Sequence, residues 1–545
     1  MNKKIYGGGF GVATALAIAL PVYAQSIPTP AQLDAGAAQR RSIEQRREIE
    51  QQSAPQEVIT DPVRVEEPPT RPAAEPAPQL SFVLKGVQIN DSAFLSREEL
   101  TAIAKPYIGR TVGFGDLQEL VAQINAAYRA REIGTAQAVL PPQQITDGIV
   151  RIELVEGRLG EFKLSGNEYT RDSFIRDRVA PEAGAVVDTK SLQKALIRFN
   201  RTSEIQLKAA LQPGAGYGLT DVLLSVDEPE RNTLQFFLDN QGVESTGYYQ
   251  LGMFARRNGL FGWDDQASVY LVGSDGTLTG SLSYGIPVNR SNGRLSVSYA
   301  RNELDIVKGP FTALDITGES ETAMLSFKQP LMVDELSQWD LALSVAQSRS
   351  ETLISGVAFS ESTVNKYSIG TSYERAETWG RWITSHTLSN ASVDSDTEKW
   401  PSFFAYTGTA NVLLPFKDCC TVAMNFGWQW LNEEQAPASE LYQIGGLSSV
   451  RGYALGILSG ARGYHAQFEA HRPLWWPGFS GFAFLDHGAV TPEPKESITG
   501  AGIGVSYRHG RRWSFDVSYG VPFNKVVPDQ DSGRLDARLV LNFYP

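Results

Sequence analysis

Hydrophobic and polar residues alternate with a period of two along the C-terminal part of the chain, from residue 231 to residue 545. In residues 513–521, WSFDVSYGV, the odd positions are aromatic or aliphatic and the even positions are small or polar. Residues 535–543, LDARLVLNF, alternate in the same way. Such a pattern is typical of strands with one apolar and one polar face. It predicts an antiparallel sheet that separates an apolar phase from a polar one.

Sixteen alternating runs can be distinguished in this part, with about 20 residues for each strand and its turn. A transmembrane strand needs roughly 9 to 11 residues, and an even number of strands closes a sheet without leaving an edge. The runs are expected to begin near Asn232, Thr246, Gln266, Thr277, Arg294, Thr322, Trp339, Asn365, Trp382, Phe404, Thr421, Gly463, Ser480, Ile498, Trp513 and Arg534.

A soluble β-sandwich would alternate in the same way. Aromatic residues near the ends of the runs favour a membrane barrel instead, because outer-membrane barrels carry aromatic girdles at both interfaces. These residues are Trp263, Tyr270, Trp382, Trp428, Trp430, Trp475 and Trp476. We therefore expect a 16-stranded transmembrane antiparallel β-barrel at residues 231–545.

Before the barrel, helical periodicity is interleaved with short strands, and the order βααββ occurs twice, at residues 80–157 and 158–230. Ser96 stands three residues before Glu99, and Asp188 precedes an amphipathic run, as expected at helix starts. A repeated small α+β module suggests a binding array more than an enzyme. The expected elements are 82–89, 96–104, 114–131, 136–140 and 148–155 in the first unit, and 161–164, 170–179, 188–200, 205–211 and 220–226 in the second.

The N-terminus has the pattern of a secretory signal peptide at residues 1–24. Lys3 and Lys4 precede an apolar stretch at residues 10–20, and small residues stand before Gln25. The alternative is a membrane anchor, but the apolar stretch is shorter than the roughly 20 residues that a spanning helix needs. The mature protein is therefore expected to be exported.

Residues 25–52 contain a predicted helix, from residue 30 to 52, in which Arg and Glu are interleaved without an apolar stripe. Such a helix is either exposed to solvent or lies in a polar cavity, and composition alone does not decide between the two. Residues 53–79 are rich in proline and predict an extended linker.

The remaining composition points away from enzymatic chemistry. The formal charge of -12 provides no electrostatic footprint for nucleic acid. Cys419 and Cys420 are adjacent, so a structural disulfide between them would be strained. No metal-ligand spacing, GxSxG motif or phosphate loop is present, and we expect no catalytic residue, no cofactor and no metal. The histidines are His386, His465, His471, His487 and His509.

One motif stands out. Residues 445–460, GGLSSVRGYALGILSG, place Arg451 among glycines, small polar residues and aliphatic residues. It lies in the long connection between the eleventh and twelfth expected strands. On the thirteenth strand, FLDHG places Phe484, Asp486 and Gly488 on one parity, whereas His487 faces the other side.

The whole arrangement resembles the outer-membrane transporters of two-partner secretion, the haemolysin secretion and activation protein family. It comprises a signal peptide, a polar helix, a proline-rich linker, two βααββ units and a 16-stranded barrel, and the resemblance covers the mature chain. In that family the βααββ units are periplasmic POTRA domains. The resemblance implies that the long connection folds back into the lumen and that its arginine meets the acidic residue of the thirteenth strand. The implied site residues are Val450, Arg451, Gly452, Tyr453, Phe484, Asp486 and Gly488.

A guanidinium inside a barrel is costly when unpaired, and a forked contact with a carboxylate holds a loop in one place. The alternative is an exposed Arg451 in a mobile extracellular loop. Asp239-Asn240-Gln241-Gly242 also resembles the start of the barrel in this family, and hairpin-turn chemistry explains it equally well. Members commonly end on phenylalanine, whereas this chain ends on Phe543-Tyr544-Pro545.

The resemblance implies an outer-membrane pore whose POTRA domains bind the N-terminal secretion domain of a large exoprotein. The polar helix would plug the lumen, and the exoprotein would cross unfolded. Lipid and the barrel assembly machinery are the other expected partners. An outer-membrane assembly factor is the main alternative. A passive porin would leave the two α+β units without a purpose.

Overall fold

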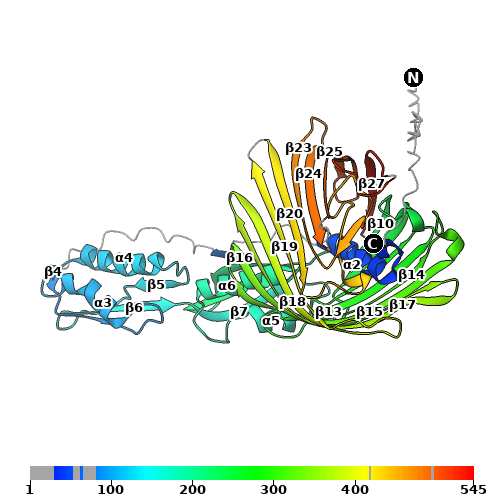
Figure 1. Cartoon of the computed structure of the whole chain (residues 1–545). Coiled ribbons are helices and arrows are strands. Elements are labelled where there is room, and N and C mark those ends of the chain that lie inside the picture. Colours follow the sequence, from blue (N-terminus) through cyan, green and yellow to red (C-terminus); the bar gives the residue numbers. More distant parts are fainter. Residues whose placement is uncertain are drawn as a thin grey trace, which may run out of the picture.

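The computed structural model describes residues 30–52, 62–65, 81–416, 419–491, 496–528 and 530–544. The expected signal peptide, residues 1–24, lies outside this range. A large barrel forms one part of the molecule, and two α+β units extend from it in a row (Figure 1). Within the described ranges, no helix is both long enough and apolar enough to cross a bilayer.

Sixteen strands form a closed barrel in which each strand pairs antiparallel with the next, which confirms the expected strand number. The barrel closes where β10 pairs with β27, with Leu234 opposite Phe543 and Asp239 opposite Arg538. Its strands are β10 (Asn232–Asp239), β11 (Gln250–Asn258), β12 (Gln266–Gly273), β13 (Thr277–Pro287), β14 (Arg294–Asp305), β15 (Ile316–Val333), β16 (Ser337–Ile354), β17 (Val357–Glu377), β18 (Gly380–Asp394), β19 (Phe403–Phe416), β20 (Cys420–Leu431), β23 (Arg462–Pro473), β24 (Phe479–Thr491), β25 (Glu496–His509), β26 (Trp513–Pro522) and β27 (Arg534–Phe543).

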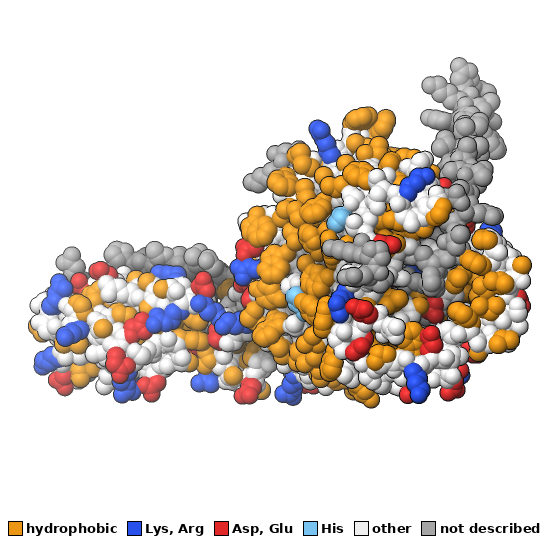
Figure 2. Space-filling model, in the orientation of Figure 1, with side chains coloured by type: hydrophobic (Ala, Val, Ile, Leu, Met, Phe, Trp, Pro, Cys, Tyr) orange, Lys and Arg blue, Asp and Glu red, His pale blue; other side chains and the backbone are white. Residues whose placement is uncertain are grey.

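The alternation of each strand separates an apolar outer wall from a polar lumen. On β13, Leu278 and Leu282 are exposed on the outside, whereas Thr279 and Ser281 are buried on the inside. Figure 2 shows hydrophobic side chains over much of the barrel wall, while charged side chains are scattered over the two α+β units. An exposed apolar wall of this kind is stable only against lipid.

Three details differ from the sequence-based expectation. Strands β15 and β17 begin at Ile316 and Val357, earlier than expected, because pairing continues through residues 316–321 and 357–364, where the regular alternation of apolar and polar residues is lost. Strand β11 begins at Gln250, since Glu244–Thr246 forms a short 3-10 turn, η2. Tyr270 belongs to no girdle. It is 1% exposed and its hydroxyl donates to Gln45 in the lumen (2.9 Å).

The first α+β unit packs helices α3 (Arg97–Ala104) and α4 (Phe114–Ala130) on a three-stranded sheet ordered β3-β6-β5. Ser96 caps α3 by accepting from the Glu99 amide (3.2 Å). The expected strand at 82–89 is split in two, because its first residues pair with β4 and its last with β6. The strands are β2 (Phe82–Val83), β3 (Gly86–Ile89), β4 (Thr111–Val112), β5 (Ala136–Val139) and β6 (Ile149–Glu156), and the 3-10 helix η1 covers Lys105–Tyr107.

The second unit has strands β7 (Arg158–Ser165), β8 (Gln206–Pro213) and β9 (Leu219–Asp227), with helices α5 (Asp172–Val179) and α6 (Thr189–Thr202). Its sheet has the order β1-β8-β9-β7. Strand β1 (Val63–Val65) comes from the segment expected to be an extended proline-rich linker. Its pairing was not predicted, since three residues are too few to show alternation and the strand depends on a partner distant in sequence.

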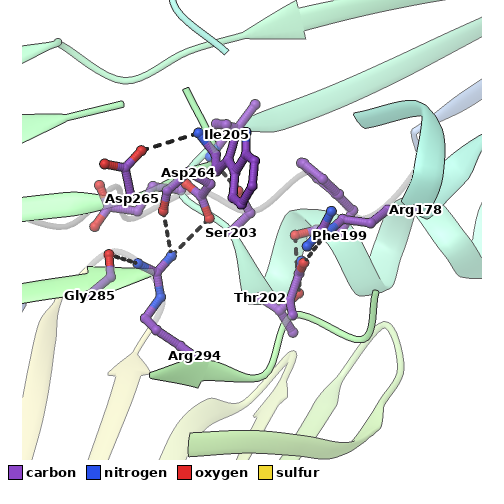
Figure 3. Close-up of polar contacts among 12 residues, drawn as sticks. Arg178, Phe199, Thr202, Ser203, Ile205, Asp264, Asp265, Gly285 and Arg294 are labelled. Carbon is purple, nitrogen blue, oxygen red and sulfur yellow. Dashed lines mark hydrogen bonds and ion pairs between the residues drawn. The ribbon is translucent and has the colours of Figure 1, made fainter. Parts of the chain in front are cut away.

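Polar contacts attach the second unit to the turns of the barrel (Figure 3). Arg178 donates to the side chain of Asn292 (2.6 Å), whose amide donates to Thr202 (2.8 Å). Asp264, in the turn between β11 and β12, accepts from Arg294 of the barrel strand β14 (2.9 Å) and also contacts Ser203 of the second unit. Burial raises the pKa of Asp264 to about 7, and the Arg294 charge opposes that rise. The joint is therefore built from buried polar groups.

Candidate functional site

The connection between β20 and β23, residues 432–461, lies inside the barrel and is called the lumenal loop. It contains the 3-10 turn η4 (Ala438–Glu440) and a small hairpin of β21 (Tyr442–Ile444) and β22 (Leu458–Gly460). Its apolar residues pack together with apolar residues of the barrel wall in one hydrophobic cluster. The buried members are Ile444, Val450, Tyr453, Ile457, Leu458, Val490 and Ile498. The loop is thus packed like a small core, and Arg451 is only 6% exposed.

Arg451 makes a forked contact with Asp486 of β24. Its Nε and Nη2 atoms donate to the two carboxylate oxygens (2.7 and 2.9 Å), and its backbone amide donates to the same carboxylate (3.0 Å). Nη1 contacts Glu469 of β23. The guanidinium carbon lies 3.7 Å from the centre of the Phe484 ring. Because Asp486 is fully buried, water cannot stabilise its charge, and the carboxylate and the Arg451 guanidinium stabilise each other. We call this arrangement the Arg451 clamp.

The other motif residues fit the loop to the wall. Gly452 has a φ of 90° and lies where β26 comes close: a Cβ at Gly452 would be 3.0 Å from the Gly520 carbonyl carbon. Gly488 leaves room for Val450, whose Cγ2 would be 3.0 Å from an added Cβ. The hydroxyl of Tyr453 lies 2.9 Å from the Thr499 carbonyl oxygen.

Sequence reasoning named Arg451 and Asp486 but missed Glu469 and the glycines beneath the loop. Glu469 shares one parity with Gln467 and His471 on β23, and His471 contacts its carboxylate. Three polar residues of one parity on a membrane strand were a usable signal for a lumenal site. A Cβ at Gly500 would lie 2.1 Å from the Arg451 carbonyl oxygen, and glycine within a strand is a known sign of close backbone approach.

His487 faces away from the clamp. Its ring nitrogens lie near the Tyr464 hydroxyl (3.3 Å) and the Thr499 hydroxyl (2.8 Å). Cys419 and Cys420 are free thiols. Among the described residues, no three His, Cys, Asp or Glu side chains are grouped so that they could hold a metal ion.

Helix α2 (Ala35–Gln52), preceded by α1 (Pro30–Leu33), lies inside the barrel (Figure 1) and is called the plug helix. Gln39 donates to the carbonyl oxygens of Ala300 (2.8 Å) and Ser320 (3.1 Å). Its own oxygen accepts from the Ser320 and Thr322 hydroxyls (2.6 and 2.8 Å). A helix without an apolar stripe is therefore satisfied by a polar lumen, which decides between the two possibilities left open by composition.

The plug helix also contacts the lumenal loop. Arg40 donates to the Leu441 carbonyl (3.2 Å), and Arg41 donates to the Gln443 side chain (2.7 Å). Before the helix, Gln32 donates to the Leu455 carbonyl (2.7 Å). The loop and the helix therefore fill the lumen together and share hydrogen bonds.

Asp239 is a further lumenal residue to which sequence reasoning assigned no role beyond architecture. It is 3% exposed and pairs with Arg538 of β27 (3.1 Å) across the closure of the barrel. Gln45 of the plug helix lies within 3.4 Å of the same carboxylate. Asp239 thus joins the first strand, the last strand and the plug helix.

Comparisons with known proteins agree with this geometry. A profile described as haemolysin secretion/activation protein ShlB/FhaC/HecB matches residues 218–507, more than half of the 545 residues. A profile described as POTRA domain, ShlB-type, matches residues 82–157.

Among curated relatives, the heme/hemopexin transporter protein HuxB of Haemophilus influenzae (strain 86-028NP) is 24% identical over 98% of each chain. The outer membrane transporter CdiB of Dickeya dadantii (strain 3937) is 24% identical over 81% of this chain and 83% of its own. The solved structure of CdiB from Escherichia coli superposes with a TM-score of 0.67 at 19% identity, covering 95% of this chain and all of that one. The chain therefore belongs to the ShlB/FhaC/HecB family of haemolysin secretion/activation proteins, and it is an outer-membrane transporter of two-partner secretion with periplasmic POTRA domains.

Proposed function

We propose that the POTRA domains of this protein bind the N-terminal secretion domain of one large exoprotein, which then crosses the barrel unfolded to the cell surface. The observation that carries the proposal is the plug helix. Its buried apolar side chains, Ala35, Ala38 and Ile49, lie toward its two ends, and hydrogen bonds to the wall hold the part between them, so water or a passing polypeptide can replace the central contacts. A permanent structural helix would bury an apolar stripe.

Each step of this transport is assigned to a separate segment of the chain. We assign residues 1–24 to a signal peptide, 25–52 to the plug segment and 53–79 to the linker. Residues 80–157 and 158–230 are the two POTRA domains, and 231–545 form the barrel. Lipid surrounds the barrel, and the barrel assembly machinery inserts it.

The Arg451 clamp would hold the lumenal loop so that the pore keeps a defined path. Val450 and Tyr453 anchor the loop in its apolar cluster, Gly452 and Gly488 allow close approach, and Arg451 pairs with Asp486. Phe484 supports the guanidinium from one face. These residues would position the loop and take part in no covalent chemistry, in keeping with a transporter rather than an enzyme.

Because the periplasm holds no ATP, folding of the exoprotein outside the cell would drive transport. The test is to delete this protein in its native host and to quantify the partner exoprotein and the ordinary outer-membrane barrels in each cell fraction. Loss of the exoprotein alone from the surface supports the proposal. A joint fall of many barrels would identify an assembly factor and contradict it.

A further inference from the structure

Four residues of the barrel wall form an apolar cluster inside the lumen, next to the closure between β10 and β27. They are Phe237, Phe254, Tyr270 and Val272, and all four are buried. The rings of Phe237 and Tyr270 are stacked, with their centres 6.0 Å apart. Leu271, between two of them in sequence, is exposed on the outer wall, so the cluster faces inward. We call these four residues the lumenal aromatic cluster.

The plug helix covers this cluster. Ile49, near the end of the helix, is buried against the four residues. Beside it, the Tyr270 hydroxyl donates to the Gln45 side chain (2.9 Å). The cluster thus already holds one branched aliphatic side chain of a polypeptide. When the plug helix leaves the lumen, this apolar surface loses its cover and faces water, which is unfavourable until another apolar side chain replaces Ile49.

The wall itself holds the cluster in place. Phe237 lies over Gly252 of the neighbouring strand, where a Cβ would collide with its ring. The Arg538 guanidinium lies 5.3 Å from the centre of the same ring, and Asp239 pairs with that guanidinium (3.1 Å). These contacts do not involve the plug helix. The cluster therefore keeps its shape in the open pore and is a preformed site.

The wall formed by β15 to β18 has a different chemistry. The Thr322 and Ser348 hydroxyls lie 2.9 Å apart, and so do those of Ser368 and Ser389. Thr322 contacts the plug helix, and Ser368 has the parity of Lys366, which contacts the lumenal loop, so both pairs face the lumen. Small hydroxyls exchange a protein partner for water at little net cost. A moving chain is therefore held weakly on this wall, whereas the aromatic cluster can bury an apolar side chain.

We propose that the lumenal aromatic cluster binds apolar side chains of the exoprotein while it crosses the pore. An aromatic or branched aliphatic side chain of the unfolded chain takes the place of Ile49, and the polar segments around it slide along the hydroxyl-lined wall. The inference rests on the proposed function, because the exoprotein supplies that side chain. The plug helix and the exoprotein then compete for one site, so an arriving apolar segment hinders the return of the helix.

The test measures how long a probe peptide stays in the open pore. The probe has about 30 Gly and Ser residues, enough to span the membrane, with one central Phe, and the reference peptide has Ser at that place. Current recordings of the purified full-length protein in planar bilayers give the duration of each block during an opening. The Phe probe should stay roughly tenfold longer than the reference peptide, because it buries one apolar side chain. Equal durations would overturn the proposal.

Variants of the cluster locate the site. Phe254→Gln should shorten the blocks of the Phe probe to those of the reference peptide, whereas Phe254→Leu should keep most of their length. Val272→Thr and Val364→Thr exchange the same methyl group for a hydroxyl. Val364 lies in another hydrophobic cluster, together with Leu441 of the lumenal loop. Only Val272→Thr should shorten the blocks, and it keeps the test valid if Phe254→Gln does not fold. Long blocks that persist in Val272→Thr and in folded Phe254→Gln would refute this site.

Ile49→Gln separates the site from the plug helix. This change removes the side chain that covers the cluster and leaves the wall intact. Openings should become more frequent, while the blocks of the Phe probe should last as long as in the wild type. Blocks shortened as much as in Phe254→Gln would show that the probe contacts the plug helix, and the proposal would be wrong.

Secretion in cells tests the exoprotein as the ligand. At equal barrel level, Phe254→Gln should secrete the exoprotein several-fold more slowly than the wild type, and Val364→Thr should secrete normally. Normal secretion by Phe254→Gln would refute the exoprotein as the ligand of the cluster.

The probe needs no exoprotein, so this inference and the proposed function can fail separately. If the deletion strain loses its exoprotein but both peptides block the pore equally, only the binding site is wrong. If the deletion strain secretes normally, the proposed function is wrong, and the block durations alone decide whether the cluster binds apolar side chains.

Discussion

The POTRA domains and the barrel bury opposite kinds of side chain. The second POTRA domain encloses Leu196, Phe199 and Val222, all nearly inaccessible to water. The barrel encloses Arg451, Asp486 and polar groups around the plug helix, and it exposes leucine and valine on its outer wall. The alternation of apolar and polar residues along a strand therefore suits a domain surrounded by water and a barrel surrounded by lipid.

The difference determines which parts can be removed. An apolar core stabilises a domain because its side chains have no better place in water. Polar groups in a wet lumen can exchange protein partners for water at a small net cost. The barrel can thus hold contents that leave, whereas a POTRA domain cannot lose its core and remain folded. The Arg451 clamp is the exception, because its charges are buried and fixed.

Arg451→Ala should have the largest effect, since it leaves the buried Asp486 without its partner, a loss of about 3–5 kcal/mol in comparable cases. The lumenal loop should detach and secretion should fall, with the barrel still in the membrane. Secretion is measured at equal barrel level. Arg451→Lys should rescue poorly because it cannot form the fork. Arg472→Ala, at an exposed position on the same wall, is the control. Unchanged secretion in Arg451→Ala would refute the clamp.

Leu196→Ala and Leu282→Ala compare a leucine in the core of the second POTRA domain with a leucine on the lipid-facing wall of the barrel. Leu196 is fully buried in the second POTRA domain, so its truncation should cost about 2–5 kcal/mol. Leu282 is 56% exposed on the outer wall, where lipid chains fill the space left by truncation, and it should cost clearly less. Proteolysis of the full-length protein in denaturant separates the two. Equal losses would contradict the contrast between the core of the domain and the outer wall of the barrel.

Asp264 connects the two regions and should make their docking sensitive to pH. Its pKa is about 7 when buried, against 3.8 as the ordinary value. The docked state therefore holds a proton that the undocked state releases between about pH 4 and 7. Docking should be strongest below pH 4 and should weaken as the pH rises through 7, by an amount on the order of a few kcal/mol.

Distances between spin labels on the second POTRA domain and the barrel would report this change at pH 5 and pH 8. Asp264→Asn should remove the pH dependence, while Asp177→Asn, at an exposed position on α5, should retain it. A pH dependence that persists in Asp264→Asn would assign it to another group.

Gln39→Ala should have the smallest effect, because water can replace the lost contacts in the lumen. A loss of about 1 kcal/mol corresponds to roughly fivefold more frequent openings in planar bilayers. Arg472→Ala, at an exposed position of the barrel, should leave the frequency of openings unchanged. If Gln39→Ala opens no more often than the wild type, the hydrogen bonds of Gln39 do not hold the plug helix in the lumen.

Much of the fold followed from the sequence because its signals are local. Alternation over residues 513–521 and 535–543 predicted strands that the structure contains. Ser96 and Asp188 cap the helices that they were expected to begin. Strand β1 and the lumenal position of Tyr270 were not predicted, since each depends on a partner more than a hundred positions away or on the curvature of the closed wall.

In the candidate site, too, some residues were predicted from the sequence and others were not. The motif residues were named from the sequence with the help of a family resemblance, and the structure brings Arg451 and Asp486 into a forked contact. Glu469 and Gly500 were missed, because their roles arise from the height at which the loop crosses β23 and β25.

The sequence by itself determined the strand number, the apolar outer wall and the polar character of the plug helix, because periodicity and composition act over a few neighbouring residues. Only the tertiary structure decided where the helix lies, which carboxylates meet Arg451 and that β1 covers the edge of β8. Those choices depend on closing a sheet and packing a loop inside it, and so on distances between residues that the chain order alone leaves undefined.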